Sequence, residues 1–366
     1  MRITDLKITL TRRPVTRRSV VDGVVRANID VIVLQILTDA GIEGQSMVYC
    51  GQSGIPAAHF YAEVMRPFLI GRDPARIEAI WQEMLVLDRF HAFMQINYPG
   101  PIDVALWDIA GKRAGLPLWQ LLGGYRDRVP CYESSPFYPA IDDYVAHVRR
   151  AQALGFKAFK LHPPRQAQRE VEACTAVREA VGDSMVLMSD PVAAYDHREA
   201  LWVGRQLERL DYYWFEEPLA DTDIHGYIEL CRALDIPIAG VEFLSGGLYT
   251  TAEYIVRRAV DIVRSDVSWK GGFTGVRKTA ALAEAFGLKC ELHLTVVPLL
   301  QVANLHAACA IKNCDYHEVA GVEGETWGLK REFTLDADGC MAAPTGPGLG
   351  VDLDWDVLDQ ATILRL

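Results

Sequence analysis

The chain has 366 residues, which is enough for two domains or for one barrel with additions. Half of its residues are hydrophobic, 23% are charged and the formal net charge is -11, which is ordinary for a globular enzyme. No lysine- or arginine-rich tract is long enough to indicate nucleic-acid binding, and no apolar run approaches the roughly 20 residues of a membrane helix.

The cysteines and the N-terminus favour a reducing compartment. The eight cysteines are scattered, with no C-x-x-C pair and no zinc-type spacing, a pattern typical of free buried thiols. The N-terminal stretch lacks the apolar core of a signal peptide. We therefore expect a cytoplasmic protein that binds neither nucleic acid nor membrane.

The first third of the chain changes from a strand pattern to a helix pattern. Residues 3–10 alternate loosely and residues 27–37 are rich in β-branched side chains, which predicts strands. From about residue 56 to 122, large apolar residues recur at helical spacing, with breaks at Gly71 and Pro101. An α+β region is therefore expected up to about residue 125.

After Gly123 and Gly124, short apolar runs alternate with amphipathic segments in a regular order. Such alternation predicts parallel βαβ units, and eight runs favour a closed barrel over an open sheet. The turn-rich end, from about residue 319, is expected to pack back on the N-terminal region. The expected strands are 129–133, 158–162, 185–190, 212–216, 236–242, 261–266, 289–293 and 315–318, with helices such as 142–154, 169–181 and 275–286 between them.

Nearly every expected barrel strand ends in a charged or imidazole residue. From Lys160 onward these residues recur every 24 to 30 positions, one βα unit each time. In a barrel they converge on the rim at the carboxyl ends of the strands, and charges there need partners or a metal ion. The set is Glu133, Lys160 with His162, Asp190, Glu216, Glu242, Asp266, His293 and Glu318.

Three of these residues form a candidate metal site. Asp190, Glu216 and Glu242 end three adjacent strands, so their carboxylates meet and repel one another unless a cation lies between them. An oxygen-only set without thiolates suits a hard divalent ion, magnesium before manganese.

The other residues suggest acid–base chemistry around that ion. Lys160 and His162 are two residues apart and point to the same side of their strand, while Asp266 and His293 end neighbouring strands opposite them. An aspartate that orients a histidine makes a base. The ion and Lys160 would bind a substrate carboxylate, and removal of the α-proton would give an enediolate.

The motifs in this region identify a family resemblance. The chain resembles the enolase superfamily, and within it the mandelate racemase subgroup (mandelate racemase/muconate lactonizing enzyme-like), over essentially its whole length. Sites of that superfamily pair a Lys or His base with magnesium that stabilises an ene-diolate. The matching motifs are GFKAFKLH at 155–162, WFEEP at 214–218, PIAGVE at 237–242, SD at 265–266, GGFTG at 271–275, DVALWD at 103–108, GLPL at 115–118 and PGLG at 347–350.

The resemblance implies an α/β fold, a modified (β/α)7β TIM-type barrel at 126–318 beneath an α+β capping domain at 1–125, which the C-terminal segment 319–366 completes. It also implies roles for site residues: Asp190, Glu216 and Glu242 as Mg2+ ligands, Asp266 with His293 as the base dyad, Glu318 as a residue that donates to or orients the substrate carboxylate, and Lys160 as a carboxylate contact. The cap loops near 12–24 and 47–54 would select the substrate.

Two departures from the family pattern leave the overall reaction open. His162 replaces the second lysine of the lysine-x-lysine motif, and Val192 replaces an asparagine often found two residues after the first metal ligand. The leading hypothesis is dehydration of an acid sugar to a 2-keto-3-deoxy acid by a homo-oligomeric lyase. The alternatives are a racemase, epimerase or lactone cycloisomerase, and more distantly a non-catalytic binding relative. The Arg17–Arg18 pair hints at an anionic far end of the substrate.

Overall fold

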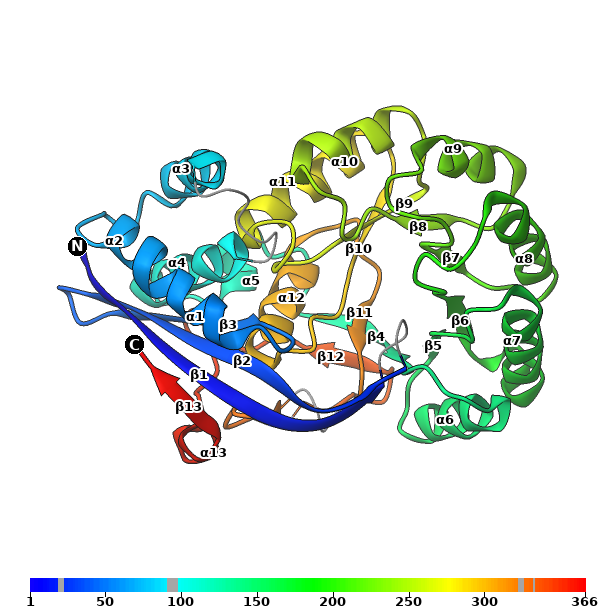
Figure 1. Ribbon diagram of the computed structural model, residues 1–366, viewed down its shortest axis with the longest axis horizontal. Coiled ribbons are helices and arrows are strands. Elements are labelled where there is room, and N and C mark those ends of the chain that lie inside the picture. The colour runs from blue at the N-terminus through cyan, green and yellow to red at the C-terminus, as the bar shows by residue number, and fades with distance from the viewer. Residues whose placement is uncertain (19–22, 91–97, 322–325, 332) are drawn as a thin grey trace.

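A computed structural model of the chain (Figure 1) describes residues 1–18, 23–90, 98–321, 326–331 and 333–366. It consists of a cap, in which helices cover an antiparallel sheet, and a barrel of parallel strands surrounded by helices. In the described part of the chain, no helix has both the length and the apolar character needed to cross a membrane.

The cap sheet has the strand order β13-β1-β2-β3, with antiparallel neighbours. The change from strands to helices, predicted at about residue 56, is confirmed, since α1 begins at Gly54. The cap strands are β1 (Ile3–Arg18), β2 (Val25–Thr38), β3 (Glu43–Tyr49) and β13 (Thr362–Arg365), and the cap helices are α1 (Gly54–Phe60), α2 (Arg66–Leu69), α3 (Ile77–Phe90), α4 (Pro99–Ala114) and α5 (Leu118–Leu121), with a π-helical turn at Tyr61–Met65 between α1 and α2.

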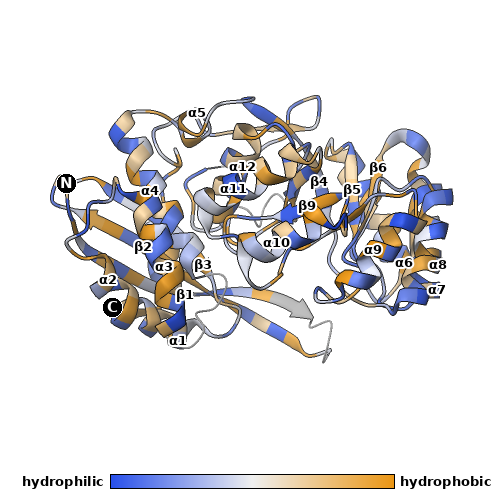
Figure 2. Cartoon of the chain, turned by 90° about the horizontal axis from the view of Figure 1, so that it is seen from above, coloured by the Kyte–Doolittle hydropathy of each residue, from blue (hydrophilic) through white to orange (hydrophobic). Residues whose placement is uncertain are grey.

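Alternation along the cap strands forms the cap core. Ile8, Leu10, Ile32 and Leu34 are buried against the helices, and Figure 2 shows the alternating hydrophobic and hydrophilic bands along β1 and β2. Side chains of successive strand residues point to opposite faces, so Ile32 and Leu34 face the cap helices, while Val31 and Val33 on the other face are buried in the larger core that includes the barrel. Each fully buried aliphatic side chain of this kind contributes about 1.5–3 kcal/mol to folding.

The barrel is closed, because β11 pairs with β4 at the end of the sheet. Eight parallel strands with intervening helices confirm the predicted (β/α)7β fold. The strands are β4 (Arg128–Ser134), β5 (Ala158–Leu161), β6 (Val186–Ser189), β7 (Trp214–Glu216), β8 (Ile238–Gly240), β9 (Ile262–Ser265), β10 (Lys289–Leu292) and β11 (His317–Val319). The helices are α6 (Ile141–Ala153), α7 (Ala167–Val181), α8 (His197–Arg209), α9 (Ile224–Ala233), α10 (Gly247–Val256), α11 (Gly272–Ala285) and α12 (Pro298–Ala310), with a 3-10 turn at Gly182–Ser184.

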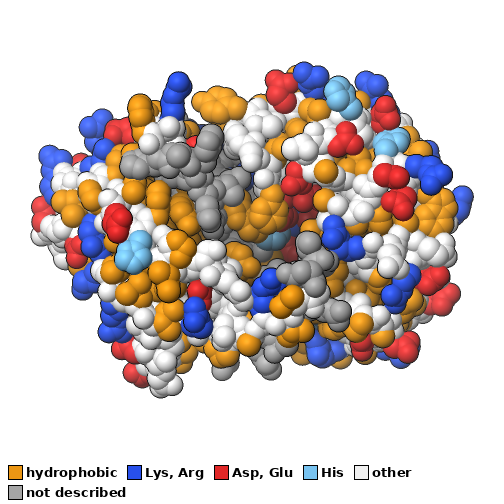
Figure 3. Space-filling model, in the orientation of Figure 1, with side chains coloured by type: hydrophobic (Ala, Val, Ile, Leu, Met, Phe, Trp, Pro, Cys, Tyr) orange, Lys and Arg blue, Asp and Glu red, His pale blue; other side chains and the backbone are white. Residues whose placement is uncertain are grey.

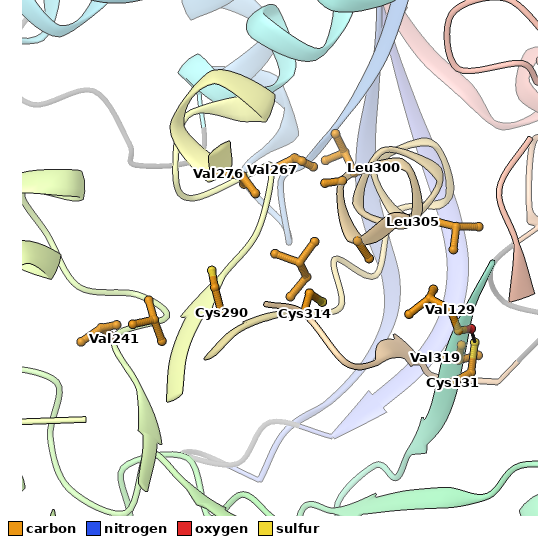
Figure 4. Close-up of a cluster of buried hydrophobic side chains, with 14 of the residues drawn as sticks. Val129, Cys131, Val241, Val267, Val276, Cys290, Leu300, Leu305, Cys314 and Val319 are labelled. Atoms are coloured by element: carbon orange, nitrogen blue, oxygen red, sulfur yellow. Dashed lines mark hydrogen bonds between the residues drawn. The ribbon is translucent and has the colours of Figure 1, made fainter. Parts of the chain in front are cut away.

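The barrel has two apolar layers, one between its strands and the surrounding helices and one inside it. Residues that point outward pack against the helices, and Figure 4 shows part of this layer, with Val129 on β4, Cys290 on β10, and Leu300 and Leu305 on α12. The other residues point inward and form a small inner layer that carries the charged groups above it. This inner layer comprises Tyr132, Ala158, Met188, Trp214, Ala239 and Ile262.

The C-terminal segment contacts both parts of the chain. As predicted, it returns to the cap, where α13 (Trp355–Ala361) leads into β13 beside β1. Before that, β12 (Cys340–Ala342) pairs antiparallel with β4 of the barrel, a contact that the turn-rich sequence did not predict. The domain boundaries at 125 and 318 remain a proposal.

Candidate active site

The structure brings the eight residues with predicted roles to the carboxyl ends of the barrel strands. Most of them are in phase with the inward-facing residues of their strands, as Asp190 is with Met188. Glu242 is the exception, because it follows the inward-facing Ala239 by three residues, after Val241 with a φ angle of 72°. In Figure 3, acidic side chains gather in a hollow near the middle of the face, where the cap meets the barrel. The residues are Lys160, His162, Asp190, Glu216, Glu242, Asp266, His293 and Glu318.

Lys160 lies at the centre of this group and is fully buried. Its Nζ atom lies 3.0 Å from Oε2 of Glu216, 3.0 Å from Oε1 of Glu318 and 3.3 Å from Oδ2 of Asp190. Burial lowers the pKa of Lys160, but Glu216 and Glu318 outweigh it and raise that pKa well above its usual range. Lys160 is therefore a permanent cation that holds three carboxylates together.

Arg264 on β9 is a second buried cation, which the pattern of strand ends did not reveal. Its Nη2 donates to Oε2 of Glu318 at 2.7 Å, and its Nε lies 2.7 Å from Oε1 of Glu216 and 3.8 Å from Oε2 of Glu242. The signal was present: Arg264 precedes Asp266 by two residues and so faces the same side of the strand. Its position inside an apolar run concealed it.

Glu318 is held by both cations. Its Oε1 faces Lys160, its Oε2 accepts from Arg264, and the backbone N–H of Leu294 donates to Oε2 at 3.0 Å. Although burial raises the pKa of Glu318, Lys160 and Arg264 bring it well below its usual range. Of the two roles predicted for Glu318, donating to the substrate carboxylate does not fit these contacts, because an ionised carboxylate does not donate. Its role in orienting the substrate carboxylate stays a prediction.

Asp190, Glu216 and Glu242 offer a donor set of carboxylate oxygens without thiolates, which fits a hard divalent cation. Among the described residues, Oε1 of Glu216 is buried and accepts no hydrogen bond of good geometry, so it can bind an ion. As the side chains lie, no three His, Cys, Asp or Glu residues of the described part are gathered for a metal. Their oxygens face Lys160, Arg264 and two histidines instead. Burial, followed by Glu217, raises the pKa of Glu242 well above its usual range.

His162 has a fixed tautomer. Its Nδ1 lies 2.6 Å from the backbone carbonyl oxygen of Ser135, which only accepts, so Nδ1 carries the proton. Its Nε2 lies 3.2 Å from Oδ2 of Asp190. The ring of Phe137 packs against the imidazole with centroids 5.2 Å apart. Nε2 is therefore the atom that His162 presents to the site.

His293 has the same arrangement on the opposite side, with a carboxylate in place of the carbonyl. Its Nδ1 lies 3.0 Å from Oδ2 of Asp266, and its Nε2 lies 3.2 Å from Oε1 of Glu242. Asp266 is itself fixed, because Thr295 donates to its Oδ2 and the N–H of Trp269 to its Oδ1. The predicted Asp–His pair thus has the geometry of a base held and charged by an aspartate.

The loop after Asp190 carries backbone strain where the family often has asparagine. Val192 and Ala193 have φ angles of 56° and 52°, a left-handed conformation that disfavours β-branched residues and costs about 1–3 kcal/mol each. Arg165 holds this conformation by donating to the carbonyls of Val192 at 2.9 Å and Ala193 at 3.2 Å. In return, the N–H of Val192 donates to Oδ1 of Asp190 at 3.0 Å and orients that carboxylate.

A buried glutamate behind this loop leads to a prediction on pH. Ser189 and Tyr195 donate to Glu170, and burial raises the pKa of Glu170 to about 7. The folded state then holds a proton that the unfolded state releases near pH 4.5, so this group lowers stability as pH rises through about 4.5 to 7. Glu170→Gln should gain stability relative to the native protein between pH 5 and 8, measured by urea unfolding. A difference independent of pH would contradict this.

The prediction that Glu133 belongs to the ring of charged strand ends is wrong. On β4, Tyr132 points inward, so Glu133 points outward to the helices, where Nε2 of His147 lies 3.0 Å from its Oε1. The N–H of Gly321 donates to the same oxygen at 3.0 Å. Glu133 therefore fixes α6 and the segment after β11, and it does not reach the site.

The basic cluster near the N-terminus divides into two parts. Nε of Arg12 lies 2.8 Å from Oδ1 of Asp30 on the neighbouring strand, so this arginine forms an ion pair within the cap sheet. The side chains of Arg17 and Arg18, and the loop at 19–22, lie outside the described residues. The suggestion that this pair meets an anionic substrate end therefore stays a prediction.

Comparisons with known proteins point to one family. A family model described as "Mandelate racemase / muconate lactonizing enzyme, N-terminal domain" matches residues 7–123, and one described as "Enolase C-terminal domain-like" matches residues 143–357. The chain is 34% identical over 272 residues to L-talarate/galactarate dehydratase of Salmonella typhimurium, covering 73% of this chain and 68% of that one.

Two further relatives span the chain almost completely. The chain is 31% identical to 3,6-anhydro-alpha-L-galactonate cycloisomerase of Streptomyces coelicolor, covering 91% of this chain and 92% of the relative. The crystal structure of D-glucarate dehydratase from Agrobacterium tumefaciens complexed with magnesium superposes with a TM-score of 0.90 at 32% identity, covering 100% of both chains. The chain belongs to the mandelate racemase/muconate lactonizing enzyme family of the enolase superfamily.

Proposed function

We propose that this chain is a magnesium-dependent lyase that removes the α-proton of an acid sugar and dehydrates it to a 2-keto-3-deoxy acid. The observation that carries the proposal is the pair of histidines, His162 and His293, which present Nε2 atoms to the same group of carboxylates from opposite sides. Three relatives named as dehydratases of acid sugars support it.

In this proposal Asp190, Glu216 and Glu242 hold the metal ion. When bound, magnesium supplies positive charge beside the substrate carboxylate, which stabilises the enediolate. Lys160 supplies a second positive charge to the same carboxylate, from a position fixed by its three carboxylate contacts. The substrate is thus bound by its acid group, whatever the rest of the sugar.

His293 is the base. Its Nε2 takes the α-proton, and the electrons of the broken C–H bond move toward the substrate carboxylate. The resulting imidazolium is stabilised by Asp266, whose carboxylate already accepts from Nδ1. Trp269, whose ring centroid lies 4.6 Å from that of His293, covers one face of the imidazole and limits its contact with water.

His162 is the acid that completes the dehydration. In its protonated form, Nε2 gives its proton to the β-hydroxyl as the C–O bond breaks, and water and an enol are the products. The enol then tautomerises to the 2-keto acid. The carbonyl of Ser135 fixes Nδ1 as the other N–H of the ring, so the transferable proton is the one on Nε2.

A second candidate function is an isomerase, either a racemase, an epimerase or a lactone cycloisomerase. The matching distances of 3.2 Å from each Nε2 to a carboxylate favour it, because two bases on opposite faces can exchange one proton. A cycloisomerase is among the relatives. In that mechanism His162 receives or returns a proton at the α-carbon and no water leaves.

The test has two parts. The protein with magnesium is screened against mono- and di-acid sugars for 2-keto acid formation, and each active substrate is then incubated in D2O with His162→Gln. If the native protein is a dehydratase, His162→Gln should still exchange the α-hydrogen of the substrate through His293 but should form little 2-keto acid. Inversion or lactone conversion by the native protein, with no 2-keto acid from any substrate, would favour the isomerase instead.

A further inference from the structure

The barrel interior holds more negative charge than the predicted site accounts for. Asp190, Glu216, Glu242 and Glu318 are each at most 6% exposed, and Lys160 was the one cation expected among them. Buried carboxylates need paired charges, because water is not there to solvate them. Arg264, which is fully buried at the same height, supplies the second cation.

Lys160 and Arg264 form a closed ring with two of the carboxylates. Glu216 presents Oε2 to Lys160 at 3.0 Å and Oε1 to Nε of Arg264 at 2.7 Å. Glu318 presents Oε1 to Lys160 at 3.0 Å and Oε2 to Nη2 of Arg264 at 2.7 Å. Two cations and two anions alternate around this ring, so its formal charge is zero.

Aromatic side chains of the inner barrel layer support the ring from below. Arg264 lies over the indole of Trp214 at 5.7 Å, and Lys160 lies over the ring of Tyr132 at 5.7 Å. The indole N–H of Trp214 also donates to Oε2 of Glu216 at 3.0 Å. These contacts restrict both cations, so the ring has little freedom to rearrange.

Asp190 and Glu242 lie outside the ring, and when both are ionised, as carboxylate ligands of a metal are, they carry a formal charge of minus two. We propose that Arg264 is a positioning residue that completes the neutral ring, so that the site folds without its metal and a divalent ion has to balance those two carboxylates alone. This inference rests on the proposed metal ligands. Arg264 also limits the affinity of the site for its metal, because the guanidinium charge repels a cation bound at Glu216.

The variant Arg264→Met tests both consequences, with Arg264→Lys to restore the charge. In EDTA, Arg264→Met should melt well below the native protein, and saturating magnesium should recover much of the difference. Its Kd for Mg2+ by calorimetry should be roughly tenfold lower or more, since a nearby positive charge is gone. Arg264→Lys should lie between the two proteins in both measurements.

Two controls separate charge from packing. Arg257→Met removes a charge from an exposed pair with Glu253 and should change neither measurement. Arg264→Met/Glu318→Gln removes one charge of each sign and should melt above Arg264→Met alone in EDTA. The double variant and Arg264→Lys also keep the test decisive if Arg264→Met alone does not fold.

Three outcomes would overturn the inference: equal losses of melting temperature with and without magnesium, an unchanged or weaker Kd in Arg264→Met, or no recovery in the double variant. Failure of the proposed function looks different, because the native protein itself would then bind no Mg2+ in calorimetry. In that case the metal part of the inference falls with it, and the EDTA melting temperatures still decide whether the ring stabilises the fold.

Discussion

The variant His293→Asn should lose turnover by a factor of about 10^2–10^4, the contribution expected of a positioned general base. Asparagine keeps a donor near Oδ2 of Asp266 but has no atom that can take a proton at the place of Nε2. The α-hydrogen of the substrate should also stop exchanging with D2O. Steady-state kinetics and exchange followed by NMR, on the substrate found in the screen, provide the measurement.

A matched control for this variant is His197→Asn. His197 begins α8 and pairs with Glu229 at the surface, so this change should leave both turnover and exchange intact. Magnesium affinity should stay within a few-fold in both variants, since neither histidine belongs to the proposed ligand set. Normal hydrogen exchange in His293→Asn would remove His293 from the mechanism.

The variant Lys160→Met should lower the free energy of unfolding in EDTA by about 3–5 kcal/mol, the loss expected when one partner of a buried ionic group is removed. Three carboxylates, from Asp190, Glu216 and Glu318, would then lose the cation that lies within 3.3 Å of each of them. Urea unfolding with EDTA, followed by circular dichroism, measures the change.

Lys157→Met is the matched control, because Lys157 lies just before the same strand and is exposed. It should change the free energy of unfolding by less than about 0.5 kcal/mol, as surface substitutions usually do. A loss of similar size in both variants would show that Lys160 does not compensate the buried carboxylates.

The barrel and the position of its site follow from two regularities of the sequence. A βα unit recurs every 24 to 30 residues, and each unit ends in a polar residue such as Asp190 or His293. Because all parallel strands end on the same face, the end of the strand is enough to place these residues together. The location of the site can therefore be predicted without knowing which of these side chains contact one another.

What could not be predicted depends on direction and on distant contacts. Glu133 ends its strand like the others, but it is one position out of phase with Tyr132 and points away from the site. Arg264 lies within a strand and not at its end, so the strand-end pattern passed over it. The pairing of β12 with β4 joins segments about 200 residues apart, for which neither segment carries a local signal.

Val192, which stands where the family often has asparagine, is supported by a contact that could not be predicted from the sequence. The left-handed backbone at this position suits asparagine, and a valine there needs support from elsewhere. Arg165 provides it from the loop after β5 by donating to three consecutive carbonyls, those of Pro191, Val192 and Ala193. The substitution therefore moves the stabilising group to another loop and leaves Asp190 oriented.

The pairing of β1 with β13 has a consequence for synthesis of the chain. Thr9 lies opposite Arg365, so the ribosome must add the rest of the cap and the whole barrel before β1 gains its outer neighbour. At about 5–20 residues per second that interval is roughly 20–70 s. During it, β1 is an open edge with unpaired backbone groups, the kind of surface that another nascent chain can pair with. Yield in the cell should therefore depend on how crowded the translating ribosomes are, even when the finished protein is stable.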